Sequence, residues 1–128
     1  MADPEALFAG LAVALGVDTL PRDNNGGIRL TIGDDATVIL FAEGERSILA
    51  VSPIAAMPRV PEYGVMVWLL RRNLYDSDLA PFQIGCDAGG NLILWGRVPV
   101  AGMTGAALAG LVDAVGSESG RIRAAIEG

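Results

Sequence analysis

Three pairs of carboxylates are the residues of this sequence whose types and spacing could do acid–base chemistry. They are Asp34 with Asp35, Glu43 with Glu45, and Asp76 with Asp78. Paired carboxylates transfer protons when burial or a shaped pocket holds their pKa values apart. All three pairs fall in predicted turns or loops, where acidic residues are normally solvated and stabilise the turn. We therefore predict that the chain is not an enzyme.

The other candidate chemistry is equally sparse. Cys86 is the single cysteine and the chain has no His to activate it, which favours a buried, inert thiol. Gly105 and Gly110 have the spacing of a phosphate-binding loop, but Leu111 and Val112 follow where Lys and Ser/Thr are needed. The acidic residues lack the spacing of an EF-hand loop. We expect no catalytic residue, no metal and no cofactor.

Charge and hydropathy exclude further classes. The 128 residues carry 9 basic and 15 acidic side chains, a net charge of −6, whereas binding to nucleic acid needs clustered cations. The longest uncharged stretch, residues 98–112, is too short and too interrupted by Pro and Gly to be inserted in a membrane. An acidic N-terminus and a lone cysteine are typical of a cytoplasmic protein. The length predicts a single domain over residues 1–128.

The elements that would position these residues follow the order α-β-β-β-α-β-β-α. Asp3, Pro4 and Gly16 mark the ends of a first helix. Strands are predicted at 28–32, 37–42 and 47–51, and their short connections make them an antiparallel meander. Prolines at 53, 58 and 61 argue against a long regular element over 52–61.

The second half of the chain supplies a helix, a hairpin and a last helix. The helix is predicted at 62–74 and the hairpin strands at 82–86 and 92–98. A third helix starts at Thr104, and its apolar spacing continues to Ile126; whether it breaks between Gly116 and Gly120 stays open. The fold class is therefore α+β, a twisted antiparallel sheet with three helices.

The strands at 37–42, 47–51 and 92–95 are apolar on both faces. A sheet with one solvated face should alternate apolar with polar residues, and these strands do not. Three modest helices leave apolar surface for a second subunit or a bound peptide. The alternative is that the helices lie on both faces of the sheet and bury all of its apolar surface within the monomer. Trp68 and Trp95, the two tryptophans, fit either core packing or an interface.

One stretch resembles a known family. The run from Trp68 to Leu74, WLLRRNL, is followed by residues 81–87, a Gly-Gly-Asn turn, Leu-Ile-Leu-Trp at 92–95 and a Pro-containing exit. This is similar to the second half of the class I type III secretion chaperones, the Tir-chaperone family, in which a helix with a Leu-Leu-x-x-Asn motif precedes a hairpin and a C-terminal amphipathic helix. The first half matches the same layout more loosely, so the resemblance spans essentially the whole chain.

The resemblance implies a small acidic homodimer of the bacterial cytoplasm. It would bind the N-terminal region of a cognate effector in extended form and keep it soluble and secretion-competent without ATP; contact with components of the secretion apparatus is left open. The implied dimer interface consists of Val65, Trp68, Leu69, Arg72, Ile93 and Trp95. The implied effector-binding residues, on apolar grooves and a sheet edge, are Leu7, Leu11, Ile28, Leu30, Ile39, Phe41 and Leu49.

Two other functions remain as alternatives. One is an adaptor or regulatory protein-binding module with the same fold that is not tied to secretion. The other is an enzyme or ligand-binding domain that uses the acidic turns, which would need a well-formed pocket at Asp34 or Asp76. For the chaperone, we expect the negative charge to limit self-association and to suit basic effector segments.

Overall fold

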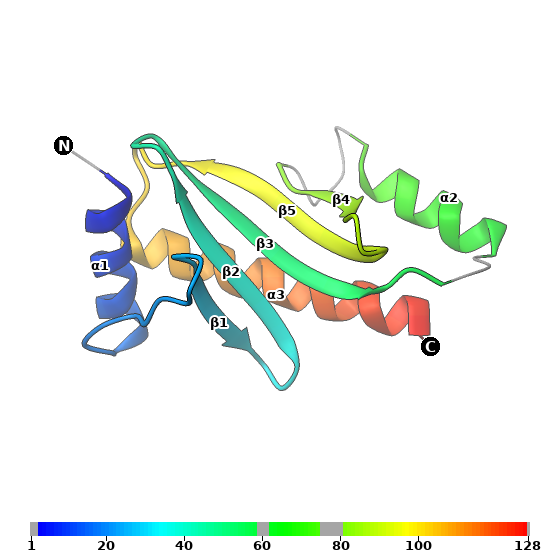
Figure 1. Ribbon diagram of the computed structural model, residues 1–128, viewed down its shortest axis with the longest axis horizontal. Coiled ribbons are helices and arrows are strands. Elements are labelled where there is room, and N and C mark those ends of the chain that lie inside the picture. The colour runs from blue at the N-terminus through cyan, green and yellow to red at the C-terminus, as the bar shows by residue number, and fades with distance from the viewer. Residues whose placement is uncertain (1–2, 59–61, 75–80, 128) are drawn as a thin grey trace.

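The computed structural model describes residues 3–58, 62–74 and 81–127, which form the predicted α+β order of elements. The helices are α1 (Pro4–Leu15), α2 (Tyr63–Arg72) and α3 (Gly105–Glu127), and the strands are β1 (Ile28–Ile32), β2 (Ala36–Glu43), β3 (Ser47–Ala56), β4 (Gln83–Cys86) and β5 (Asn91–Pro99) (Figure 1). None of the helices in these ranges is long and apolar enough to cross a membrane.

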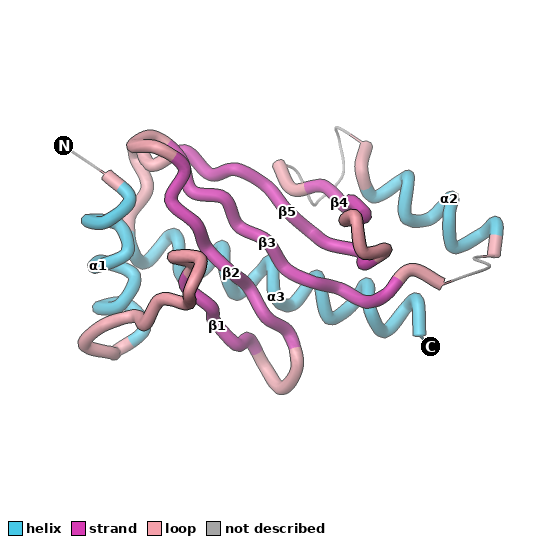
Figure 2. Tube along the Cα trace, viewed as in Figure 1, coloured by secondary structure: helices cyan, strands magenta, loops and turns pink. Residues whose placement is uncertain are grey.

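The strands form an antiparallel sheet in the order β1-β2-β3-β5-β4. The predicted meander and the predicted hairpin are two halves of this sheet, joined where β3 pairs with β5 (Figure 2). Strands β1 and β4 are consequently its two edges.

Helix α3 covers one face of the sheet. In Figure 1 it runs behind the strands along the length of the molecule. It packs against β2 and β3, in which Val38, Leu40 and Ala50 are fully buried. Helix α1 packs against α3 near Gly10 and Gly105, where the two backbones almost touch, and α2 packs against β4 at the other end. The core therefore lies between α3 and one face of the sheet.

The proline-containing segment after residue 51 differs from the prediction. Strand β3 continues through Pro53 to Ala56, with a bulge between Pro53 and Ala55. The carbonyl groups at the bulge receive hydrogen bonds from α3, because Ser119 donates to Pro53 at 3.1 Å and Arg123 donates to Ile54 at 2.6 Å. Proline is compatible with a strand at such an irregularity.

Helix α3 is continuous, which settles the question left open at Gly116 and Gly120. Gly116 lies against β1, so close that a Cβ there would be 2.6 Å from Ile32. A Cβ on Gly120 would have no neighbouring atom within 4 Å. The first glycine permits close packing of helix on sheet, and the second has no such role.

Candidate functional site: an uncovered sheet face

The face of the sheet opposite α3 carries a continuous apolar surface. Cross-strand pairing places Phe41 beside Leu49, Ile39 beside Val51, and Val51 beside Trp95. Each of these side chains is only partly buried. On this side of the sheet, no helix of the described residues lies in front of β2, β3 and β5 (Figure 1). We call this surface the open face; its residues are Ile39, Phe41, Leu49, Val51, Ile93 and Trp95. It confirms the expectation that apolar strand surface is left uncovered.

Two aromatic rings of the open face lie against glycines of neighbouring segments. A Cβ on Gly27 would be 2.6 Å from the Phe41 ring, and a Cβ on Gly85 would be 3.3 Å from the Trp95 indole nitrogen. The absent side chains let both rings lie low over the backbone, a recognised way to compensate for glycine in a sheet. The rings are thereby held in place before any partner binds.

The predicted effector-binding residues divide between this face and the core. Ile39, Phe41 and Leu49 lie on the open face. Leu30 is half-buried on the α3 side of the sheet, opposite Val38. Leu7, Leu11 and Ile28 are 6%, 0% and 1% exposed and belong to the core. These three therefore cannot contact a partner on the folded surface, because their helical and strand spacing faces them inward.

The α2 residues predicted for the dimer interface also face the chain itself. Leu69 is buried, Val65 packs against the core, and Arg72 forms an ion pair with Glu118 of α3. Trp68 lies at the border, 36% exposed, with the Arg72 guanidinium 5.2 Å from its ring centre. The remaining two predicted dimer residues, Ile93 and Trp95, lie on the open face.

The opposite side of α2 is apolar and exposed. Tyr63 and Leu70 are 85% and 66% exposed, and Val67 between them is half-buried. Their spacing of four and then three residues places them on one side of a helix. We call these three residues the outer α2 stripe. Leu74, 51% exposed, continues it beyond the end of the helix.

Sequence reasoning missed the role of one residue in the family-like motif. The side-chain amide of Asn73 is hydrogen-bonded to both backbone groups of Ile84 in β4. An amide that offers a donor and an acceptor side by side can imitate one step of a neighbouring strand. The position of Asn73 directly after the helix indicated that its side chain could bind backbone groups, but the sequence did not identify Ile84 as the partner.

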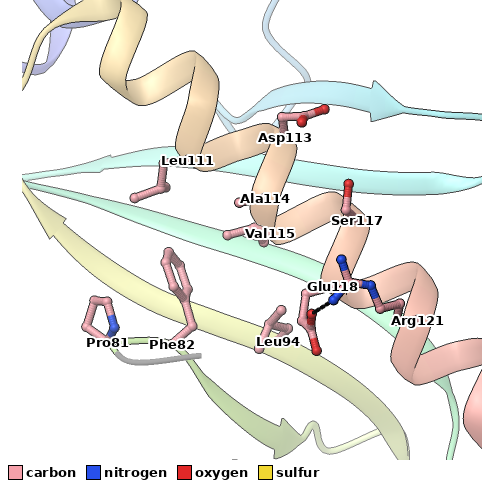
Figure 3. Close-up of a pocket in the computed structure, with 10 residues that line it drawn as sticks. All are labelled: Pro81, Phe82, Leu94, Leu111, Asp113, Ala114, Val115, Ser117, Glu118 and Arg121. Carbon is pink, nitrogen blue, oxygen red and sulfur yellow. Dashed lines mark hydrogen bonds and ion pairs between the residues drawn. The ribbon is translucent and has the colours of Figure 1, made fainter. Parts of the chain in front are cut away.

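A groove runs between α3 and the start of the β4–β5 hairpin. Its apolar lining includes Phe82, Leu94 and Val115, and its volume is about 490 Å³ (Figure 3). At one end Glu118 pairs with Arg121 at 3.0 Å and also binds Arg72. The Glu118 carboxylate is thus shared between two arginines, and with Asp113 and Ser117 it forms the polar part of an otherwise apolar lining.

The candidate chemical residues lie apart and on the surface. Asp34 and Asp35 are exposed in the β1–β2 turn, and Glu43 pairs with Arg97 at 2.6 Å. Asp76 and Asp78 lie outside the described residues. Cys86 is exposed, contrary to the prediction of a buried thiol, because it ends the edge strand β4. Within the described ranges no group of three potential ligands could hold a metal ion.

Comparison with known families and structures gives one consistent result. Residues 6–118 match the model of the Tir chaperone protein (CesT) family. A chain of the heterodimeric ExoU–SpcU complex from the type III secretion system of Pseudomonas aeruginosa is 27% identical, with a TM-score of 0.76 over 94% of this chain and 97% of that one.

Two other solved structures share the fold at lower identity. The Yersinia pestis type III secretion chaperone SycH, in complex with a fragment of YscM2, matches at 18% identity and a TM-score of 0.71, covering 88% of this chain and 93% of that one. The HopA1–SchA chaperone–effector complex matches at 17% identity and a TM-score of 0.68, covering 97% of this chain and 93% of that one. Among curated protein sequences, none matches this chain.

Proposed function

Because this chain belongs to the Tir chaperone protein (CesT) family, we propose that it is a type III secretion chaperone for a cognate effector. It binds the N-terminal region of that effector in extended form, keeps it soluble and secretion-competent without ATP, and acts in the bacterial cytoplasm. The related SycH and SchA structures, each a chaperone with a bound protein, support this proposal.

The observation that carries the proposal is the open face. Three neighbouring strands, β2, β3 and β5, present aliphatic and aromatic side chains on a surface that none of the helices in the described ranges covers. Full burial of an exposed aliphatic or aromatic side chain contributes about 1.5–3 kcal/mol, and each half-buried side chain of the open face would contribute a part of this energy. Aromatic residues are among those that contribute most to interfaces. An effector segment laid across Phe41 and Trp95 would gain this energy without any chemical step.

An extended effector segment also needs backbone partners, which a free sheet edge supplies. At the β4 edge, the amide of Asn73 already binds Ile84. At the β1 edge, Arg22 forms a single bridge with Ile28. We assign the effector strand to the β1 edge, beyond that bridge and beside Arg29, whose cross-strand partner in β2 is Ile39 of the open face.

The second surface, the outer α2 stripe, is the proposed contact with a second copy. A helix side on which Tyr63 and Leu70 are exposed and Val67 is half-buried can pack against the same side of a second copy, which suits the twofold interface of a homodimer. Helix α2 therefore remains the proposed dimer element. Its exposed side, and not the inward-facing Leu69 and Arg72, would contact the second copy. The open face then stays free for the effector.

The absence of enzyme activity is part of the same proposal. Its support is the exposed position of Asp34 and Asp35 and the pairing of Glu43 with Arg97, since acid–base catalysis needs sheltered carboxylates.

Capture from the native bacterium tests the function. The tagged chain and its Phe41→Asp variant are immobilised side by side, and the proteins that each retains are identified by mass spectrometry. We expect one large secreted protein on the unmodified chain and its loss from the variant. Retention of regulators alone would instead favour a same-fold adaptor.

A further inference from the structure

The charge of the open face has the opposite sign to that of the whole chain. Among the strand residues on the same side of the sheet as the open face, Arg29 and Arg97 are basic, opposite Ile39 and Leu49, and Glu43 is acidic, opposite Ser47. These three described strand residues have a net charge of +1, whereas the chain carries −6. The strand charges beside the open face therefore favour an acidic group of the partner at this place.

The two arginines differ in their surroundings. Arg97 donates to Glu43 at 2.6 Å, and its guanidinium lies 5.4 Å from the Trp95 ring centre, so its charge is already compensated. Arg29 is exposed, and no acidic group of the described residues forms an ion pair with it. It is the cation of this face that a partner can neutralise.

The position of Arg29 relates it directly to the apolar surface. It pairs across the strands with Ile39, and cross-strand partners in antiparallel strands have Cβ atoms about 4.5–5.5 Å apart. On its other side, Thr31 and Thr37 form a polar pair at the end of β1 and β2. Arg29 thus stands where the apolar part of the open face meets its polar corner.

We propose, resting on the proposed function, that Arg29 selects effector segments in which an acidic side chain accompanies the apolar residues that cover Ile39 and Phe41. The segment is amphipathic, with one or two carboxylates at that end and without a long acidic run, which the overall negative charge would repel. Charged pairs at the rim of an interface determine specificity and association rate more than total affinity. Arg29 is accordingly a specificity-determining residue.

A displayed library of random peptides tests this without knowledge of the effector. Peptides are selected on the unmodified chain, depleted on the Phe41→Asp variant so that only open-face binders remain, and sequenced. The same selection is run on Arg29→Glu and on Arg46→Glu, an equal charge change in the β2–β3 turn. We expect Asp or Glu at a fixed offset from aromatic or branched residues on the unmodified chain and on Arg46→Glu.

The Arg29→Glu selection should instead enrich Lys or Arg at that offset. For one selected peptide, Arg29→Glu should weaken binding about tenfold, equivalent to about 1.4 kcal/mol, and a Glu-to-Lys change in the peptide should restore it. If the peptides that bind the open face show no preference for Asp or Glu, or show the same preference on Arg29→Glu, the role of Arg29 is overturned and the proposed function stands. An empty pool after depletion would overturn both.

Discussion

The side chain of Asn73 completes the edge of the sheet by pairing with Ile84. Its Oδ1 accepts the Ile84 N–H at 2.6 Å, and its Nδ2 donates to the Ile84 carbonyl at 2.8 Å. One side chain thereby joins the end of α2 to β4 and occupies backbone groups that an edge strand would otherwise leave free for aggregation.

Replacing Asn73 with Ala should destabilise the chain by about 1–3 kcal/mol, because it leaves the partly buried backbone groups of Ile84 without partners. Asn73→Asp keeps an acceptor and loses the donor, so its effect should be intermediate. Urea unfolding measures both, with Asn25→Ala in the exposed 17–27 loop as a control. Equal stability of Asn73→Ala and the control would refute this role.

Two glycines of α3 should respond to Ala in opposite directions. At Gly116 the new methyl would meet Ile32 at 2.6 Å, and such overpacking typically costs about 1–3 kcal/mol. At Gly120 the methyl meets nothing within 4 Å and should add up to about 1 kcal/mol through helix propensity. Thermal unfolding of the two variants tests the continuous helix, and a shift of the same sign in both would contradict it.

The ion pair between Glu118 and Arg72 should hold α2 against α3. Glu118 is 13% exposed and binds both Arg72 and Arg121, so Glu118→Gln removes a sheltered charge and should cost about 1–3 kcal/mol. Hydrogen exchange should accelerate in α2 more than in α1, with Glu127→Gln as the exposed control. Uniform exchange across the chain would show that α2 docks without this pair.

The outer α2 stripe should control the oligomeric state. Leu70→Glu changes a side chain that is 66% exposed, so the fold should persist while the dimer dissociates. Val13→Glu, at a residue of α1 that is 79% exposed, is the matched control and should remain dimeric. Sedimentation velocity at micromolar concentration distinguishes the two masses. A Leu70→Glu protein that stays dimeric would place the second copy elsewhere.

The pattern of the sequence was sufficient for the order of elements. Asp3 caps α1 by accepting the Ala6 N–H at 2.7 Å, and Gly16 ends the helix with a positive φ of 74°, as their types predict. The alternation in β1 and the short turns likewise predicted the meander correctly. Such interactions involve residues that are close in the sequence, so they can be predicted without knowledge of the tertiary fold.

The side of α2 that faces the chain could not be read in this way. Tyr63, Val67 and Leu70 are apolar on one side of this helix, and Val65 and Leu69 are apolar on another, so the hydropathy pattern does not decide which of the two sides is packed. Only tertiary contacts decide it, chiefly the burial of Leu69.

The same limit applies to β3 and Cys86. The bulge at Pro53 depends on hydrogen bonds from Ser119 and Arg123, which lie far away along the chain. Cys86 is exposed because β4 is an edge strand, and the strand order that makes it an edge is a property of the whole sheet.

The affinity of the captured effector's N-terminal fragment for the Phe41→Asp variant tests the central claim most directly. Calorimetry compares this variant with the unmodified chain and with Val13→Asp, after thermal unfolding has verified that all three are folded. If the open face binds the effector, Phe41→Asp should weaken binding at least about thirtyfold, equivalent to about 2 kcal/mol, while Val13→Asp binds normally. Binding of Phe41→Asp within about twofold of the unmodified chain, a difference of about 0.4 kcal/mol, would contradict the account.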